Sequence, residues 1–373
     1  MIVGVPREIK NEEHRVAITP IGVRELTDRG HQVLIERDAG EGSSIHDDQY
    51  EAQGATIVDS AAEVFGQAEM ILKVKEPQKS EVDLFREGQI LFTYLHLAAY
   101  PELAEGLANR GIVAIAYETV QLADRSLPLL APMSEIAGRM AAQAGAYYLE
   151  RTHGGRGLLI GGAAGVRPAK VVVIGGGMAG SNAAVIAMGM QAEVVVLDSD
   201  LNKLRWLDTL YQGRVLTLHS NKLTIEEQVL DADLVIGTVL VPGASAPKLV
   251  SEEMVESMKR GAVLVDVAID QGGCFATSRE TTHSEPVYLL HDVVHYAVGN
   301  IPGAVPHTST YALTNATLRY LVMMAQEGVV GALRAHPELN AGVNIVWDKV
   351  CHPAVAESLG VDHTPASEAL AQV

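Results

Sequence analysis

Four charged or titratable residues stand next to apolar runs of the sequence, where a fold can hold a side chain in place for chemistry. Arg15 ends the charge-rich stretch NEEHR, and its planar guanidinium is suited to a carboxylate. His96 follows the run ILFTYL, and an imidazole with an ordinary pKa of about 6.5 suits proton transfer in either direction. Lys75 ends the run MILKVK, and Asp270 follows the segment DVAI. Such a set combines a group that binds an anion with groups that exchange protons.

Each of these residues also has an ordinary structural explanation. An arginine such as Arg15, after a charged loop, is often exposed to solvent, and a lysine such as Lys75, at a strand end, often covers apolar surface with its stem. A lone His96 among apolar neighbours is commonly a hydrogen-bonded core residue. Asp270 precedes Gln271-Gly272-Gly273, where an aspartate is typical of a turn or a cap. The residues by themselves leave these alternatives open.

A glycine motif in the middle of the chain predicts a dinucleotide site. The segment KVVVIGGGMAG places Gly175, Gly177 and Gly180 in a G-x-G-x-x-G spacing, directly after an apolar strand and before a helix. In that context the glycines allow a tight turn, close approach of backbone to a pyrophosphate, and close packing of helix on strand. The alternative is a tight turn without a ligand.

The next expected strand, EVVVLD, supports the dinucleotide and indicates which one binds. It ends in Asp198, where a carboxylate accepts hydrogen bonds from both ribose hydroxyls and repels a 2′-phosphate. The sequence therefore favours NAD over NADP, although Lys203 and Arg205 nearby weaken this preference. Two later segments, Gly237–Leu240 and Asp266–Asp270, follow apolar strands and are candidates to contact the nicotinamide half. For Val239 and Leu240 the alternative is ordinary loop packing.

Short β-branched runs alternate with helical patterns, which is typical of βαβ units around mainly parallel sheets. In the first third, strands are expected at Ile2–Val5, Val33–Glu36, Ile71–Lys75, Ile90–Tyr94 and Ile112–Tyr117. An Ala-rich helix, Ser134–Arg151, is expected to link this block to a second one. Strands of the second block are expected at Lys170–Ile174, Glu193–Leu197, Val215–Leu218, Leu234–Thr238 and Val263–Val267.

The remaining segments, Ala312–Ala335 and Asn344–Leu359, are expected to be helical, and they are too short to fold alone, so they should pack on the first block. We therefore predict an α/β protein of two Rossmann-like, doubly wound domains separated by a cleft. One domain, for substrate and catalysis, comprises residues 1–133 and 301–373, and the other, for NAD, comprises 134–300.

Composition excludes several classes of partner. With 46 acidic and 28 basic residues the net charge is −18, the wrong sign for nucleic acid or an anionic membrane surface. Only Cys274 and Cys351 are cysteines, which argues against a disulfide framework and fits a reducing, cytoplasmic compartment. The start, MIVGVPREIK, does not read as a signal peptide. His291 and His295 lie four apart but in a β-branched context, so no metal site is predicted.

Several motifs spread over nearly the whole chain resemble one family. They are NEEHRVAITP (11–20), LKVKEP (72–77), TYLHLA (93–98), PMSEIAGRMA (132–141), DVAIDQGG (266–273) and GNIPGAVPHTSTYALTNAT (299–317). They look like the NAD-dependent L-alanine dehydrogenases. The soluble nucleotide-binding component of proton-translocating transhydrogenase is similar in the same regions. That component typically has an Arg-Gln-Asp loop where this chain reads LLAPMSE, and tends to have Glu where Asp270 stands, and both differences favour alanine dehydrogenase.

The resemblance implies an enzyme that reversibly deaminates L-alanine to pyruvate and ammonium with NAD, with the transhydrogenase component as the alternative. It implies that Arg15 and Lys75 bind substrate and that His96 and Asp270 are catalytic. A homohexamer is implied as well, and the apolar residues of the 134–151 helix and of Val322, Met323 and Val329 give this mild support. His307 stands where the PGAVP-x-TS motif usually has Arg, so the resemblance assigns it no role.

The same resemblance implies a set of residues that contact NAD. Besides the glycine turn, with Met178 and Ala179 inside it, and Asp198, they are Ser134, Lys203, Ser220, Val239, Leu240, Val267, Ala268, Ile269, Asp270, Arg279, Val298, Gly299, Asn300 and Ile301.

Overall fold

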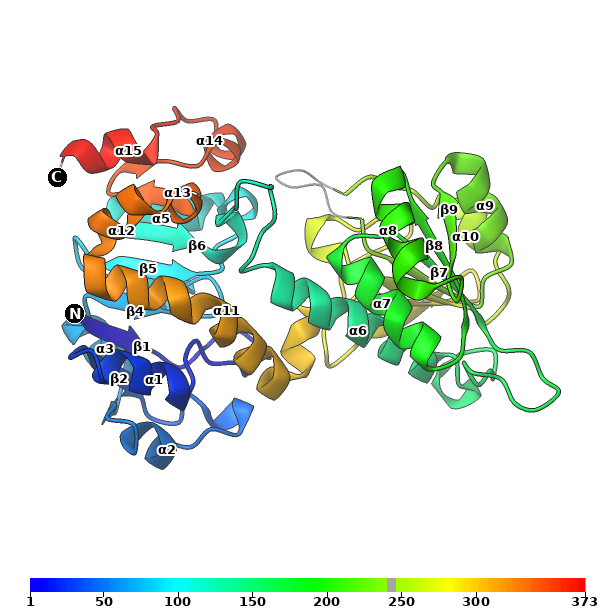
Figure 1. The fold of residues 1–373 in the computed structure, drawn as a ribbon, viewed down its shortest axis with the longest axis horizontal. Coiled ribbons are helices and arrows are strands. Elements are labelled where there is room, and N and C mark those ends of the chain that lie inside the picture. Colours follow the sequence, from blue (N-terminus) through cyan, green and yellow to red (C-terminus); the bar gives the residue numbers. More distant parts are fainter. Residues whose placement is uncertain (240–245, 373) are drawn as a thin grey trace. The chain divides into compact units, whose positions relative to one another are not determined.

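The chain folds into two compact units, each built on one sheet (Figure 1). The computed structural model describes residues 1–239 and 246–372. The first unit comprises Met1–Met133 with Val305–Val373, and the second comprises Ser134–Ala304. The α/β class with two Rossmann-like units, expected from the sequence, is confirmed.

The sheet of the first unit has the order β15-β14-β6-β5-β4-β1-β2-β3. Its strands are β1 (Ile2–Val5), β2 (Gln32–Glu36), β3 (Thr56–Val58), β4 (Met70–Leu72), β5 (Ile90–Thr93), β6 (Val113–Ala116), β14 (Val343–Val346) and β15 (Lys349–Val350). The strands β1 to β6 are parallel, and β14 and β15 extend the sheet beyond β6 in antiparallel pairing. The central strands are buried on both faces, which explains their continuous apolar runs.

Helices cover the faces of this sheet, and several begin at a proline, which suits the first helical position because its missing N–H has no partner there. They are α1 (Pro20–Thr27), α2 (Asp47–Glu51), α3 (Ala61–Gln67), α4 (Lys79–Val82), α5 (Pro101–Asn109), α11 (Pro306–Glu327), α12 (Val329–Ala335), α13 (Pro337–Ala341), α14 (Pro353–Leu359) and α15 (Ala366–Ala369).

The sheet of the second unit has the order β12-β13-β11-β10-β7-β8-β9. Its strands are β7 (Lys170–Ile174), β8 (Glu193–Asp198), β9 (Leu216–His219), β10 (Leu234–Gly237), β11 (Val263–Asp266), β12 (Val287–Leu290) and β13 (Val293–Tyr296). All pair in parallel except β12, which is antiparallel to β13. The helices are α6 (Ala131–Tyr148), which begins just before the unit, α7 (Met178–Gly189), α8 (Leu201–Tyr211), α9 (Lys222–Leu230) and α10 (Glu252–Glu256).

The six parallel strands of each sheet share one order, β6-β5-β4-β1-β2-β3 in the first unit and β13-β11-β10-β7-β8-β9 in the second. The order reverses between β1 and β4 in the first unit and between β7 and β10 in the second. In open α/β sheets, ligands bind at the carboxyl ends of the strands next to such a reversal. The carboxyl ends of β1, β4 and β5 lead to Arg15, Lys75 and His96, and the carboxyl end of β7 leads to the glycine turn.

Two sequence expectations about elements are wrong. The strand expected to run through Lys75 ends at Leu72, although Lys73 and Val74 still share backbone hydrogen bonds with β5. The helix expected over Asn344–Leu359 is the hairpin of β14 and β15 followed by the short α14. The apolar run of residues 343–346 serves as a strand because the edge of β6 is there to pair with it.

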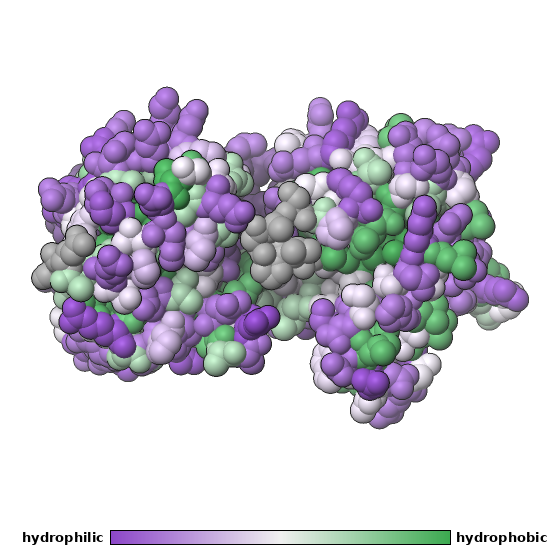
Figure 2. All heavy atoms as spheres, turned by 90° about the horizontal axis from the view of Figure 1, so that it is seen from above, coloured by the Kyte–Doolittle hydropathy of each residue, from purple (hydrophilic) through white to green (hydrophobic). Residues whose placement is uncertain are grey.

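Figure 2 shows hydrophilic side chains over much of the viewed face of both units, with apolar side chains gathered over parts of the second one. Most of the exposed large apolar residues belong to that unit, among them Leu159, Val166, Trp206, Leu216, Leu223 and Leu289. Within residues 1–239 and 246–372, no helix is long and apolar enough to cross a membrane.

Candidate functional site

Arg15 is a buried ion-pair partner rather than a solvent-exposed arginine, with 2% of its surface exposed. Its Nε donates to Glu13 Oε1 at 2.7 Å, its Nη2 pairs with Glu13 Oε2 at 2.5 Å, and its Nη1 lies 3.1 Å from Met133 Sδ. Burial disfavours the charged form, but the Glu13 carboxylate outweighs it, so the pKa of Arg15 is raised above its usual value. The guanidinium is therefore a fixed, permanent positive charge.

Arg15 also lines a cavity of about 210 Å³ in the first unit. The remaining lining residues come from the segments after β1 and β2 and are Arg7, Glu8, Glu13, His14, Asp38, Ala39, Glu41 and Gly42. Lys75 and His96 do not line this cavity. The cavity therefore lies at the carboxyl ends of β1 and β2, next to Arg15.

The segment that carries Lys75 is fixed by a buried charge network beneath it. Lys73 is fully buried, and its Nζ lies 3.0 Å from Glu8 Oε2 and 2.8 Å from Glu81 Oε1. Burial works against its charge, but the two carboxylates more than compensate, so the pKa of Lys73 is raised. Glu8 also accepts the Val74 N–H at 2.6 Å, and Thr93 Oγ1 donates to the Lys75 carbonyl at 2.9 Å. The backbone is thus held on both sides of Lys75.

His96 stands in a turn directly after β5 and adopts a left-handed backbone conformation, with φ 49° and ψ 34°. Its backbone N–H donates to Glu118 Oε1 at 2.6 Å. Its ring stacks on that of Tyr94, with centroids 5.9 Å apart, and the Tyr94 hydroxyl donates to the Leu129 carbonyl at 2.5 Å. The His96 side chain is half-buried.

Asp270 lies in the second unit, in the 3₁₀ turn Ile269–Gln271 after β11. Its side chain is exposed, and its Oδ1 accepts the Asn300 N–H at 3.3 Å. The turn is closed by Gly272, with φ 89°, and not by the aspartate side chain. The structure therefore brings two predicted site residues, Asp270 and Asn300, into contact.

Asp266, the first residue of the segment Asp266–Asp270 that the sequence offered as a nicotinamide contact, holds the loop before Asp270. Its buried carboxylate accepts the backbone N–H groups of Ala268, Cys274 and Phe275 and the Ser278 hydroxyl. Burial raises the pKa of Asp266, while these hydrogen bonds oppose that shift. The bonds fix the loop that runs from Val267 to Asp270.

The glycine turn fits a dinucleotide. Gly175 has φ 104°, a conformation that favours glycine. A Cβ on Gly180 would lie 1.7 Å from the Gly175 carbonyl oxygen, whereas a Cβ on Gly177 would meet nothing within 4 Å. The turn is therefore tight at Gly175, closely packed at Gly180, and open at Gly177, directly before the N-terminus of α7. This is the arrangement that a pyrophosphate requires.

Four predicted or neighbouring residues gather where the ribose of a dinucleotide would be bound. Asp198 is the last residue of β8, and its Oδ2 accepts the Gly176 N–H at 2.7 Å. Lys203 Nζ lies 3.6 Å from the same oxygen, and the Ser220 N–H donates to the Asp198 carbonyl at 2.9 Å. The Asp198 carboxylate therefore already holds the turn, and Lys203 partly balances its charge.

The other predicted NAD contacts lie at several places in the second unit. Ser134 is on α6, and Val267, Ala268 and Ile269 follow β11. Arg279 places its guanidinium 4.2 Å from the centre of the Tyr288 ring. The Val298 to Ile301 segment includes Asn300 in a left-handed conformation, with φ 61°. Val239 follows β10, and Leu240 lies outside the described residues.

The histidines noted in the sequence have separate surroundings. His295 is buried in β13, with Nε2 2.9 Å from Thr277 Oγ1, and burial lowers its pKa. His291, in the turn before β13, lies 2.8 Å from Glu252 Oε1 and 3.7 Å from Glu256 Oε1. The ligand atoms of His291, Glu252 and Glu256 all lie within 4.8 Å of one another. His307 is exposed near the start of α11, beside Tyr311.

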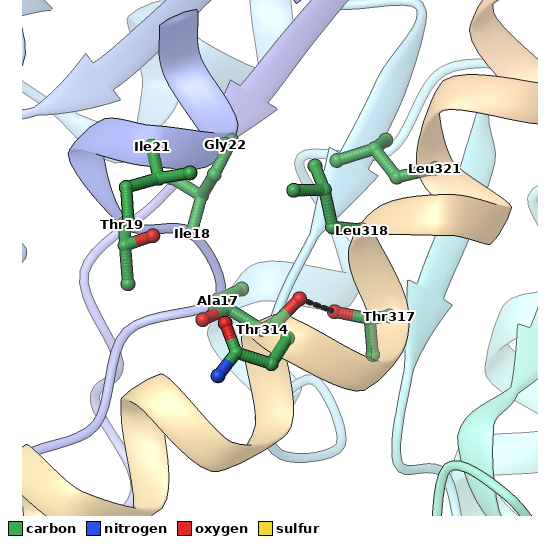
Figure 3. Close-up of a pocket in the computed structure, with 10 residues that line it drawn as sticks. Ala17, Ile18, Thr19, Ile21, Gly22, Thr314, Thr317, Leu318 and Leu321 are labelled. Atoms are coloured by element: carbon green, nitrogen blue, oxygen red, sulfur yellow. Dashed lines mark hydrogen bonds between the residues drawn. The ribbon is translucent and has the colours of Figure 1, made fainter. Parts of the chain in front are cut away.

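A second, smaller cavity of about 10 Å³ lies between α1 and α11 (Figure 3). Ile18, Leu318 and Leu321 are among the residues that line it, and Thr317 donates a hydrogen bond to the Thr314 carbonyl at its edge. None of the predicted site residues lines it. The cavity is a packing gap between two helices.

Glu13 and Glu118 are the site residues that sequence reasoning missed. Each holds a predicted functional residue, Glu13 through the guanidinium of Arg15 and Glu118 through the backbone of His96. A polar residue directly after an apolar strand was the available signal for Glu118, which follows the run IVAIAY. Nothing in the sequence connects it with a residue 22 positions earlier.

The fold and these sites define a class: a two-unit α/β protein with a G-x-G-x-x-G turn between strand and helix in one unit and a buried arginine paired with a glutamate in the other. The comparison with known families is specific. Residues 4–137 match the family domain described as alanine dehydrogenase/PNT, N-terminal domain, and residues 141–353 match alanine dehydrogenase/PNT, C-terminal domain. The chain belongs to the alanine dehydrogenase/PNT family.

Relatives match along the whole chain. The alanine dehydrogenase of Methanococcus maripaludis is 57% identical over 371 residues, which cover 99% of this chain and 100% of the relative. That of Mycobacterium tuberculosis strain H37Rv is 56% identical, covering 100% of both. A solved L-alanine dehydrogenase superimposes with a TM-score of 0.94 at 50% identity, covering 96% of this chain and 99% of that one. A transhydrogenase from Sinorhizobium meliloti is more distant, with a TM-score of 0.81, 27% identity, and coverage of 95% and 100%.

Proposed function

We propose that this chain is an NAD-dependent L-alanine dehydrogenase, which reversibly deaminates L-alanine to pyruvate and ammonium. The observation that carries this proposal is the buried, positively charged Arg15. It follows the carboxyl end of β1, at the same edge of the sheet where β4 and β5 lead to Lys75 and His96. An amino acid has the carboxylate that such a charge binds. The relatives that match over full length carry the same activity in their names.

In this proposal Arg15 and Lys75 bind the substrate and His96 exchanges its proton. Glu13 accepts hydrogen bonds from Nε and Nη2 of the guanidinium, and Met133 Sδ lies beside Nη1. Lys75 binds the carboxyl or carbonyl oxygen. A ring nitrogen of His96 takes a proton from the substrate nitrogen, or from the oxygen of the carbinolamine that water forms at Cα, and returns one in the reverse direction. Asp270, from the second unit, is the second catalytic residue.

The second unit binds the cofactor. Gly175, Gly177 and Gly180 would hold the pyrophosphate at the N-terminus of α7, and Asp198 would accept the ribose hydroxyls, which favours NAD. Further contacts are proposed for Met178, Ala179, Ser134, Lys203, Ser220, Val239, Leu240, Val267 to Asp270, Arg279 and Val298 to Ile301. When bound, the nicotinamide supplies the hydride acceptor for Cα of alanine.

The molecular setting follows from the same proposal. The units are assigned as a catalytic domain, formed by the first third and the C-terminal part of the chain, and an NAD domain between them. We propose a cytoplasmic homohexamer whose partners are its small substrates. The net charge of −18 disfavours nucleic acid and anionic membranes.

A direct assay tests the function. Purified protein with NAD and L-alanine should produce NADH, measured by its absorbance, and should consume NADH with pyruvate and ammonium. Arg15→Ala should raise KM for both acids more than it changes NAD binding, because it removes only the carboxylate partner. No turnover in either direction would contradict the proposal. Hydride exchange between NADH and an NAD analogue, without turnover of alanine, would instead support the transhydrogenase component.

A further inference from the structure

We infer that Glu118 is the positioning residue for His96: it holds the backbone of the turn that presents the imidazole, through its oxygen atoms and not through its charge. The inference rests on the proposed function, in which His96 exchanges the substrate proton. The hydrogen bonds that the structure describes for Glu118 go to the backbone N–H groups of Leu95 and His96. None of these described bonds goes to the imidazole of His96 or to the side chains of Arg15 and Lys75.

The register of the sheet explains how one carboxylate reaches both amides. The strands β5 and β6 pair in parallel, with Thr93 opposite Ala116 as the last pair. Glu118 lies two residues beyond Ala116, and Leu95 lies two residues beyond Thr93. The side chain therefore takes the place of the strand carbonyl that would have continued the ladder. The Leu95 N–H lies 3.2 Å from each carboxylate oxygen, and the His96 N–H lies 2.6 Å from Oε1.

His96 needs this support because its backbone is in an unfavourable conformation. With φ 49° and ψ 34° it occupies the left-handed region, which a residue with a Cβ adopts only when its surroundings fix it there. The bond from the His96 N–H to Glu118 Oε1 is the shortest of the three. Without an acceptor at this point, the turn would relax and the ring would leave its place.

The residues on either side of His96 are anchored in the core, so the turn has little other freedom. Leu95 and Leu97 are buried in one apolar cluster together with Val355 and Ala356 of α14. These contacts fix the ends of the turn, but they do not set the peptide plane between Leu95 and His96. Glu118 supplies that last constraint.

Three substitutions at Glu118 test whether its hydrogen-bond acceptor or its negative charge is needed. Glu118→Gln keeps an oxygen at the same reach and removes the charge, so kcat should stay within about fivefold of the unsubstituted enzyme. Glu118→Ala removes the acceptor and Glu118→Asp shortens it by one methylene, so both should lower kcat roughly 10- to 100-fold through misplacement of the ring. KM and NAD binding should change less than kcat. The ionisation in the pH profile of kcat/KM should persist in all three, whereas His96→Ala should remove it.

Glu69→Ala is the matched control, because Glu69 accepts the Ile2 N–H at 2.6 Å at the opposite, amino-terminal edge of the same sheet. It should leave kcat unchanged. Thermal unfolding of each variant checks folding. If Glu118→Ala does not fold, the comparison of kcat between Glu118→Gln and Glu118→Asp still tests the inference. An active Glu118→Asp with an impaired Glu118→Gln would show that the charge matters, and normal activity of all three would show that the contact does not; either result overturns the inference. An inactive unsubstituted enzyme would instead refute the proposed function.

Discussion

At the scale of residues, each of two buried cations in the first unit is paired with buried carboxylates. Glu13 compensates Arg15, and Glu8 and Glu81 compensate Lys73. A buried pair of this kind adds little to stability, because desolvation offsets the attraction, yet removing one member leaves a costly unpaired charge. The pairs keep cationic groups fixed where the carboxyl ends of β1 and β4 meet.

Asp198 should set the choice of cofactor. Asp198→Ala removes both an acceptor for the ribose hydroxyls and the repulsion of a 2′-phosphate. The kcat/KM with NAD should therefore fall, and the ratio of kcat/KM with NADP to that with NAD should rise. Asp200→Ala is a control, because it removes the side chain that caps α8 through the Asn202 N–H and keeps the backbone N–H that donates to Asp198 Oδ1. It should lower stability by about 1 kcal/mol and leave the NAD/NADP ratio unchanged. An unaltered ratio in Asp198→Ala would make Asp198 a structural acid only.

At the scale of elements, the close packing of α7 on the turn after β7 requires a glycine at position 180. Gly180→Ala would drive a Cβ into the Gly175 carbonyl, so it should shift α7 or the turn and weaken NAD binding at least tenfold. Gly189→Ala, in the last position of the same helix, meets nothing within 4 Å. It should be neutral, or stabilise by up to about 1 kcal/mol.

The NAD affinity of both variants is measured by titration, with protein fluorescence as the signal. Thermal unfolding measures their stability. Equal NAD affinity in Gly180→Ala and Gly189→Ala would mean that the turn tolerates a side chain, and the assignment of the pyrophosphate to this turn would fail.

At the scale of the whole molecule, stability should fall on mild acidification, partly through His295. Burial lowers its pKa, so the unfolded chain binds this proton more readily than the folded one. Stability therefore rises with pH between the lowered folded pKa and about 6.5, and is fully present above that value. Denaturant unfolding from pH 7.5 to pH 5.5 should show the unsubstituted protein losing more stability than His295→Gln. Parallel curves would contradict the role of burial.

Assembly is the second prediction at this scale. The exposed apolar side chains are concentrated in the second unit, whereas Val329, expected from the sequence to add to an oligomer surface, is buried within the first. Exposed apolar surface of this kind favours association between copies. Sedimentation should give six times 39.7 kDa, about 238 kDa. A monomer at micromolar concentration would refute the hexamer.

The sequence alone determined what depends on short separations. The β-branched runs of β1, β7 and β8 and the prolines that open α1 and α5 act over a few neighbours, so the alternation of strands and helices could be predicted. The glycine turn was predictable for the same reason, because its strand, its glycines and its helix are contiguous.

The tertiary structure decided what depends on residues far apart in the chain. The run at Val343–Val346 became a strand because β6 offered it an edge, although its local pattern had suggested a helix. Glu13 and Glu118 gained their roles from pairs that no spacing rule describes, since a carboxylate after a strand has many possible partners. Only the pairing of β5 with β6 brings Glu118 to the amides of Leu95 and His96, because register and not sequence separation sets which groups meet across a sheet.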